Sequence, residues 1–180
     1  AVRPGAADAR LEDALDVLDV VAVLVGDDVR LSEWTTLRAE ATLEFVARRA
    51  RLHALTKVYA YGAVTKGLQG KELAEIGLLA EAGAVAFTDA DHAVGNAQVM
   101  RRALYYCKAF DALIVHLPQE PTLSGGHMTS GEMATRLGLS GNPPLAEVMM
   151  VERDIRLVEM TGGRMHLAKI STAESVAVIA

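Results

Sequence analysis

Three residues have side chains that could serve a hydrolytic metal centre or its surroundings, because each lies near the end of a short apolar run. Asp89 and His116 come directly after such runs, and Lys169 lies near the end of another. In parallel α/β folds the carboxyl ends of the strands meet at one edge, where active sites form. Carboxylate and imidazole groups there can hold a metal ion that lowers the pKa of a bound water. Asp89 and His116 are therefore candidate metal ligands.

Each candidate also has a structural alternative. Asp89 could cap a turn, which aspartate does well, and His116 could be a hydrogen-bonded histidine at the rim. A lysine at the end of a buried strand needs a partner or water. Lys169 is thus either a catalytic or Schiff-base lysine or half of a salt bridge, and the salt bridge is favoured. We expect His166 to be a satisfied core or helix-facing residue, and Cys107 a packed thiol rather than a nucleophile.

An alternation of apolar runs and amphipathic segments positions these residues. Strands are expected at 20–25, 57–64, 84–88, 112–115 and 164–170, and helices at 11–18, 35–52, 71–82, 96–110, 131–137, 144–161 and from Ser171 onward. This order is typical of a parallel sheet with right-handed crossovers. The sheet is either open and doubly wound or a stretch of a (β/α)8 barrel. The sequence contains no G-x-G-x-x-G after the first strand and no Walker A motif, so no signal favours nucleotide binding.

The composition excludes several classes of protein. Of 180 residues, 51% are hydrophobic and 23% are charged, which excludes an intrinsically disordered chain. The net charge is −5, so the chain lacks the positive electrostatic field that non-specific nucleic-acid binding needs. No apolar run approaches the roughly 18 residues of a membrane helix, and we expect no secretory leader. The single cysteine, Cys107, fits a reducing, cytoplasmic setting.

Three long segments carry motifs of distinctive order and spacing. They are VTKGLQGKELAEIGLLAEAGAVAFTD at 64–89, NAQVMRRALYYCKAFDALIVH at 96–116 and ATRLGLSGNPPLAEVMMVERDIRLVEMTGGRMHLAKISTAESV at 134–176. These motifs resemble those of dihydroorotases of the bacterial type, within the cyclic amidohydrolases. The resemblance implies a (β/α)8 barrel that hydrolyses or forms the cyclic amide of dihydroorotate in pyrimidine synthesis, with zinc at the carboxyl ends of the strands.

The expected fold is therefore a partial TIM barrel of the metal-dependent amidohydrolase type, with about five of the eight βα units. Residues 41–180 are expected to form this incomplete barrel domain. Residues 1–40 form an N-terminal segment that matches the family poorly, and either replace or abbreviate the family's first strands. Five strands do not close such a barrel, so we expect either a longer protein or an open barrel whose edges another chain covers.

The chain departs from the family at the metal-ligand positions. The H-x-H pair that active members carry on the first strand does not occur in this sequence, and their FSDDG loop is represented by Asp89. Aligning the proline after the family's fifth strand with Pro121 puts Leu117 at a histidine-ligand position and His116 one place early. Since adjacent strand residues point to opposite faces, His116 cannot replace that ligand without a local shift. The ligand histidine that ends the sixth strand is replaced by Lys169.

These substitutions predict that the chain binds no zinc and is catalytically silent, because an ammonium has no lone pair and repels a metal cation. We expect Lys169 to fill the vacant site and to pair with Asp89. The sequence is most similar to non-catalytic dihydroorotase-like paralogues. That similarity implies an oligomer in which the chain is a structural partner of aspartate carbamoyltransferase or of an active dihydroorotase chain. Two alternatives stay open: an incomplete zinc-dependent dihydroorotase, and a small-molecule binding domain that keeps the barrel mouth without its chemistry.

Overall fold

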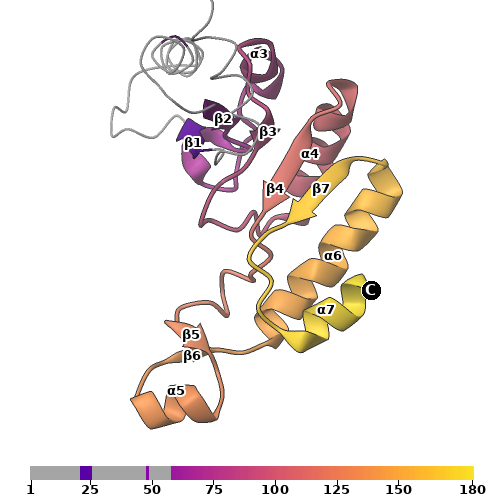
Figure 1. Ribbon diagram of the computed structural model, residues 1–180. Coiled ribbons are helices and arrows are strands. Elements are labelled where there is room, and N and C mark those ends of the chain that lie inside the picture. Colours follow the sequence, from indigo (N-terminus) through magenta and orange to yellow (C-terminus); the bar gives the residue numbers. More distant parts are fainter. Residues whose placement is uncertain (1–20, 26–47, 49–57) are drawn as a thin grey trace, which may run out of the picture.

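The computed structural model describes residues 21–25, 48 and 58–180 (Figure 1). The helices expected at 11–18 and 35–52 lie outside the described residues, apart from Arg48, which is helical. None of the helices in the described part of the chain is long and apolar enough to cross a membrane.

Five parallel strands form one sheet, in the order β1-β2-β3-β4-β7. The strands are β1 (Val21–Val25), β2 (Val58–Gly62), β3 (Ala86–Phe87), β4 (Leu113–His116) and β7 (Arg164–Leu167). Each of the five coincides with an expected strand, so the predicted alternation and the parallel sheet are confirmed. Neighbouring strands in this sheet follow one another in chain order. Each parallel connection needs a crossover, which is usually a helix.

The helices follow the expected order but differ at their ends. They are α3 (Ile76–Glu81), α4 (Ala97–Ala109), α5 (Glu132–Leu137), α6 (Leu145–Thr161) and α7 (Ala173–Ile179), with a short 3₁₀ turn, η1 (Lys66–Leu68). Asn96 caps α4 at the start of the helix expected at 96–110, since its side chain accepts a hydrogen bond from the Gln98 backbone at 2.9 Å. Gly162 ends α6 in the left-handed region at φ 65°, where glycine has no steric cost.

Two predicted helix starts are wrong for identifiable reasons. The helix expected at 71–82 begins only at Ile76, because the Ala74 backbone N–H donates to the Val64 carbonyl at 3.0 Å and holds the preceding residues in a turn. The last helix takes Thr172 as its N-cap, with the Thr172 hydroxyl accepting from the Ser175 backbone. Ser171, at which this helix was expected to begin, is bound to the Glu147 side chain of α6 instead.

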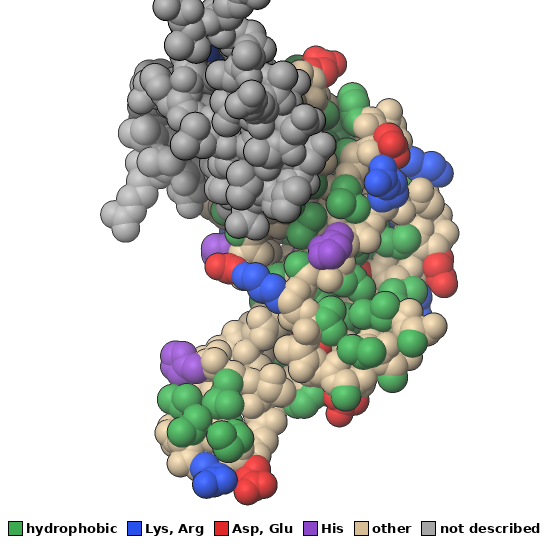
Figure 2. Space-filling model, in the orientation of Figure 1, with side chains coloured by type: hydrophobic (Ala, Val, Ile, Leu, Met, Phe, Trp, Pro, Cys, Tyr) green, Lys and Arg blue, Asp and Glu red, His purple; other side chains and the backbone are tan. Residues whose placement is uncertain are grey.

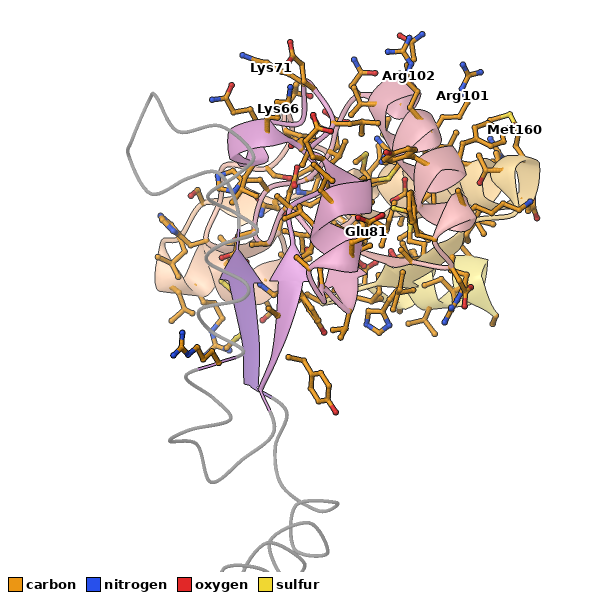
Figure 3. The ribbon with its side chains drawn as sticks, turned by 90° about the horizontal axis from the view of Figure 1, so that it is seen from above. Lys66, Lys71, Glu81, Arg101, Arg102 and Met160 are labelled. Carbon is orange, nitrogen blue, oxygen red and sulfur yellow. The ribbon has the colours of Figure 1, made fainter. Side chains whose placement is uncertain are left out.

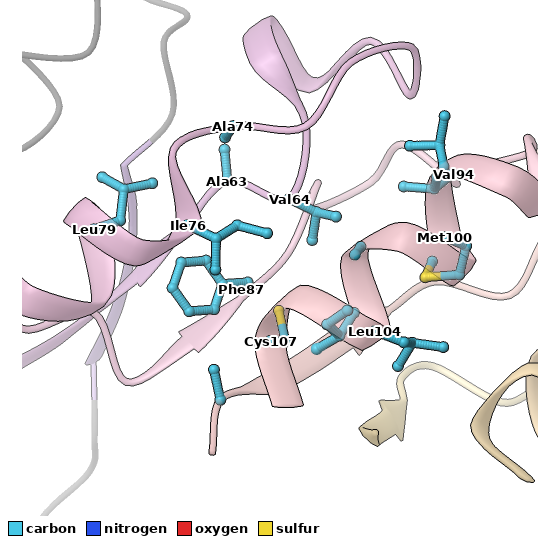
Figure 4. Close-up of a cluster of buried hydrophobic side chains, with 14 of the residues drawn as sticks. Ala63, Val64, Ala74, Ile76, Leu79, Phe87, Val94, Met100, Leu104 and Cys107 are labelled. Carbon is cyan, nitrogen blue, oxygen red and sulfur yellow. The ribbon is translucent and has the colours of Figure 1, made fainter. Parts of the chain in front are cut away.

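The hydrophobic core lies between the sheet and the helices α3 and α4. Phe87 of β3 and Ile76 of α3 are fully buried, and Leu104 and Cys107 of α4 reach the same cluster (Figure 4). Replacing Phe87 by alanine would cost about 3–5 kcal/mol. The packing of Cys107 confirms the expected buried thiol, and burial raises its pKa to about 12.

A two-stranded arm projects away from the sheet (Figure 1). It contains β5 (Met128–Thr129), α5 and β6 (Gly141–Asn142). Of these, α5 coincides with the helix expected at 131–137, and the two short strands were not predicted. The Asn142 side chain accepts hydrogen bonds from the backbone of Gly125 and Gly126, at 3.1 and 2.6 Å, and so closes the arm at its base. Hydrophobic side chains are exposed on the arm in Figure 2.

Candidate functional site at the strand ends

Asp89 follows β3 and is almost fully buried, at 3% exposure. Its carboxylate accepts hydrogen bonds from the backbone of Val64 and Thr65, at 3.0 and 2.9 Å, and from the Thr65 hydroxyl. Burial raises the pKa of Asp89 above its ordinary value, and the hydrogen bonds from Thr65 and Val64 oppose that rise. Asp89 therefore caps a turn, but the turn is the one after the neighbouring strand β2.

Thr65 extends this network into the next loop. It is completely buried, and its hydroxyl also accepts a hydrogen bond from the Gly70 backbone at 2.8 Å. The side chains of Asp89 and Thr65 thus tie the loop that follows β2 to the end of β3. The sequence analysis did not identify Thr65 as the partner of Asp89, because the two are 24 residues apart.

His116 ends β4 and is also buried, at 2% exposure. Its Nδ1 lies 2.6 Å from a carboxylate oxygen of Asp154 in α6, and its Nε2 lies 3.0 Å from the Val94 backbone nitrogen. A backbone N–H only donates, so Nε2 must be the acceptor and Nδ1 carries the proton. Both ring nitrogens are therefore used, and His116 has no lone pair left for a metal ion. His116 is therefore a hydrogen-bonded histidine, as the structural alternative from the sequence suggested. It is buried and faces α6.

Arg153 completes this cluster from the surface side. Its guanidinium donates to Asp154 at 2.9 and 2.6 Å, and to the backbone carbonyls of Val94 and Gly95, both at 2.9 Å. Asp154 itself is 0% exposed. The buried cluster of His116, Asp154 and Arg153 thereby fastens the loop after β3 to both β4 and α6.

Leu117 lies on the opposite face of the sheet from His116. Along β4 the residues alternate between buried and partly buried, and the buried face is the one packed against the helices. Leu117 follows on the other face and lines a cavity of about 780 Å³ together with residues of the loops after β2 and β3. An apolar side chain therefore faces the cavity at the position where the family has a histidine ligand.

Lys169 does not pair with Asp89, and that expectation is wrong. Its Nζ lies 2.5 Å from the carboxylate of Asp91, and both side chains are largely exposed. Asp89 is unavailable because it is turned inward onto Thr65. The hydrogen bond from Lys169, and then its charge, lower the pKa of Asp91. The salt bridge predicted for Lys169 is present, with a different partner. His166, expected inside the core or against a helix, is exposed.

Glu147 holds the residues that follow Lys169. From α6 its carboxylate accepts four hydrogen bonds, from the backbone and hydroxyl of Ser171, at 2.9 and 2.7 Å, and from those of Thr172, at 3.0 and 2.7 Å. Burial alone would raise the pKa of Glu147, but these hydrogen bonds lower it to about 2. Glu147, Ser171 and Thr172 line a second cavity of about 390 Å³.

The arrangement does not fit the zinc centre that the resemblance implies. Within residues 58–180 and the other described positions, no three histidine, cysteine or acidic side chains converge to hold a metal ion. Asp89 and His116 are committed to protein donors and acceptors, and Leu117 offers no ligand atom. Lys169 brings a cation to the remaining position. Metal-activated water chemistry therefore has no ligand set among these residues.

Comparison with known proteins supports the family resemblance. The family model described as Dihydro-orotase-like matches residues 9–175. A dihydroorotase of Syntrophobacter fumaroxidans is 46% identical over 140 residues, which cover 77% of this chain and 32% of that protein. A dihydroorotase of Syntrophotalea carbinolica is 45% identical over 141 residues, covering 78% of this chain and 33% of that protein. The chain thus spans about a third of the length of the curated relatives it matches.

Solved structures of hydantoinases share the fold. The L-hydantoinase (dihydropyrimidinase) from Arthrobacter aurescens superposes with a TM-score of 0.65 at 18% identity, over 94% of this chain and 38% of that one. A D-hydantoinase superposes with a TM-score of 0.61 at 13% identity, over 94% of this chain and 37% of that one. The chain is therefore an α/β protein with part of a TIM barrel of the amidohydrolase type, as the sequence predicted.

Proposed function

The chain belongs to the dihydroorotase-like family, and from that premise we propose that it is a catalytically silent member that binds no zinc. It acts in pyrimidine biosynthesis, in the cytoplasm, as a structural partner of aspartate carbamoyltransferase or of an active dihydroorotase chain. Its role is assembly rather than turnover.

One observation carries this proposal: the side chains at the family's ligand positions are used for other purposes. Asp89 serves as a turn cap, and His116 joins a buried cluster with Asp154. Leu117 has no donor atom, and Lys169 is a cation paired with Asp91. Regaining a metal site would need several simultaneous changes, because each of these four side chains either lacks a metal-ligand atom or already uses it in another contact.

A zinc-dependent dihydroorotase, of which this chain is one part, is the competing function. It is favoured by the similarity to curated dihydroorotases, at 46% identity in one case. The chain's own polar residues would then organise the strand ends, and ligands from elsewhere in the protein would have to supply the whole metal centre. The two functions differ in turnover, which is directly measurable.

The test is an assay of the purified full-length protein with dihydroorotate, alone and after mixing with purified aspartate carbamoyltransferase. We expect no turnover above buffer and a stable complex that elutes earlier than either component from a size-exclusion column. Turnover by the protein alone would overturn catalytic silence. Turnover with no complex would favour the zinc enzyme outright.

A further inference from the structure

One face of α4 gathers exposed basic and aromatic side chains. The α4 face consists of Arg101, Arg102, Tyr105, Tyr106 and Phe110, and α4 contains no acidic residue. The aromatic side chains are 51%, 43% and 40% exposed in chain order. The whole sequence has only one Trp, four Tyr and three Phe, so α4 and its C-cap residue Phe110 expose three residues of a scarce type.

The five side chains form a continuous stripe. Arg101 and Tyr105, Arg102 and Tyr106, and Tyr106 and Phe110 are each four residues apart, which places them on the same side of a helix. The rings of Tyr106 and Phe110 meet edge to face, with centroids 5.4 Å apart and an interplanar angle of 75°. Part of this face is thus ordered in advance, which lowers the entropy cost of docking.

Among the described residues, helices lie on both sides of the α4 face. On the α3 side, a Cβ added at Gly77 would come within 2.9 Å of the Phe110 ring. On the other side, Lys108 donates to the carbonyl of Thr161, the last residue of α6, at 3.2 Å. The α4 face therefore points outward between two helices that are both present.

The positive charge of the α4 face favours an acidic partner. Among the described residues, Arg101 and Arg102 take part in no ion pair, and in Figure 3 they lie along the same edge of the molecule as Lys66 and Lys71. A second copy that docked its own α4 here would bring like charges together, whereas an acidic surface would complement them. Tyrosine and arginine are also the residue types that dominate protein–protein hot spots.

We propose that the α4 face is a docking surface for a protein partner that presents carboxylates to Arg101 and Arg102 and an apolar recess to Tyr105. The inference rests on the proposed function for the choice of partner, so aspartate carbamoyltransferase is the probe. The aromatic part of the face supplies affinity, and the two arginines supply orientation and attraction.

Binding of the full-length protein to purified aspartate carbamoyltransferase tests the proposal by calorimetric titration. The variants are Arg101→Glu with Arg102→Glu, and Tyr105→Ala. The matched controls lie on the outer face of α6: Arg156→Glu, whose side chain is 77% exposed, and Met160→Ala, 52% exposed. Each α4 variant should weaken binding about ten-fold or more, while the controls stay within about two-fold. Binding of the unmodified protein should also weaken as salt rises.

The outcomes separate this surface from the proposed function. If the unmodified protein and every variant bind equally well, the docking surface is wrong and the proposed function stands. If the unmodified protein does not bind at all, both fail. A mixed-sequence RNA that binds tightly and loses affinity in the arginine variant, followed by fluorescence anisotropy, would overturn the protein partner in favour of nucleic acid. Self-association that the same variant abolishes would overturn it in favour of a second copy.

Discussion

Two carboxylate contacts at neighbouring strand ends, a hydrogen bond to a histidine and a salt bridge to a lysine, have nearly the same length and opposite surroundings. Asp154 and His116 are 2.6 Å apart at the end of β4, and their side chains are 0% and 2% exposed. Lys169 and Asp91 are 2.5 Å apart beyond β7, and theirs are 66% and 77% exposed. Water and salt screen the exposed pair, whereas breaking the buried one leaves uncompensated polar groups in the interior.

This difference separates the residues that stabilise the fold from the lysine charge at a position where the family has a metal ligand. The buried cluster fastens a loop, α6 and β4 together, so we expect it to dominate the free energy of unfolding. The exposed pair contributes little to folding, but it places a fixed positive charge beside the barrel mouth. Changes at the two places should therefore have distinct consequences.

The largest effect is expected from Asp154→Ala. It leaves His116 and Arg153 without their buried acceptor, and we expect a loss of about 3–5 kcal/mol in the free energy of unfolding. The matched control is Asp91→Ala, which removes an exposed carboxylate 2.5 Å from Lys169 and should cost under about 1 kcal/mol. Chemical denaturation of both variants measures the difference. Equal losses would show that burial does not distinguish the pairs.

The next largest effect on stability is expected from Glu147 as the pH is lowered. Its pKa falls from 4.5 in the unfolded chain to about 2 in the fold, so its stabilisation is complete above pH 4.5 and is lost as the pH falls toward 2. The linked loss is about 3 kcal/mol. Asp89 acts in the opposite direction, because its raised pKa makes stability fall as the pH rises through its titration. The difference between the unmodified protein and Glu147→Gln isolates the Glu147 contribution, and a pH-independent difference between pH 5 and pH 2 would contradict it.

A smaller effect is expected from Thr65→Val. The change takes one hydrogen bond from the buried carboxylate of Asp89 and leaves the Gly70 backbone N–H without an acceptor. We expect a cost of about 1–3 kcal/mol. Thr122→Val is the control, since its hydroxyl bonds to Glu120 at an exposed site and should matter by less than about 0.5 kcal/mol. Denaturation curves that shift equally for the two threonines would rule out a structural role for the Asp89 cap.

The smallest effect on stability belongs to Lys169. We expect Lys169→Ala to change the free energy of unfolding by no more than about 1 kcal/mol. Lys169→His should yield neither bound zinc nor turnover of dihydroorotate, because Leu117 and the committed Asp89 and His116 still supply no ligand set. Recovery of turnover from that one substitution would refute catalytic silence.

Most of the fold could be predicted because periodicity is local. Short runs of mostly apolar residues predict strands at five places, and all five strands are present in the sheet. The ends of the strands and helices were harder to predict, because they depend on contacts with residues that are distant in the sequence. The strand expected to reach residue 170 stops at Leu167, and Lys169 adopts a left-handed backbone at φ 58°. That bend directs the chain toward the Glu147 carboxylate, which no local pattern encodes.

The site was predictable in position but not in pairing. Asp89, His116 and Lys169 all lie at strand ends, as expected. Their partners come from 24, 38 and 78 residues away, beyond the reach of spacing arguments. One signal could have found Asp154, the partner of His116, and also Glu147, which holds Ser171 and Thr172. Glu147 and Asp154 lie on the same helical stripe as the buried Met150, Val151 and Leu157, and an acid on an apolar stripe needs a buried donor.

The metal content of the full-length protein, measured by mass spectrometry under native conditions and after dialysis against zinc, tests the central claim most directly. The account predicts no stoichiometric zinc in either sample. One or more zinc ions per chain, retained through dialysis and lost when Asp89 or His116 is replaced, would contradict it, because those side chains would then have exchanged their protein partners for a metal.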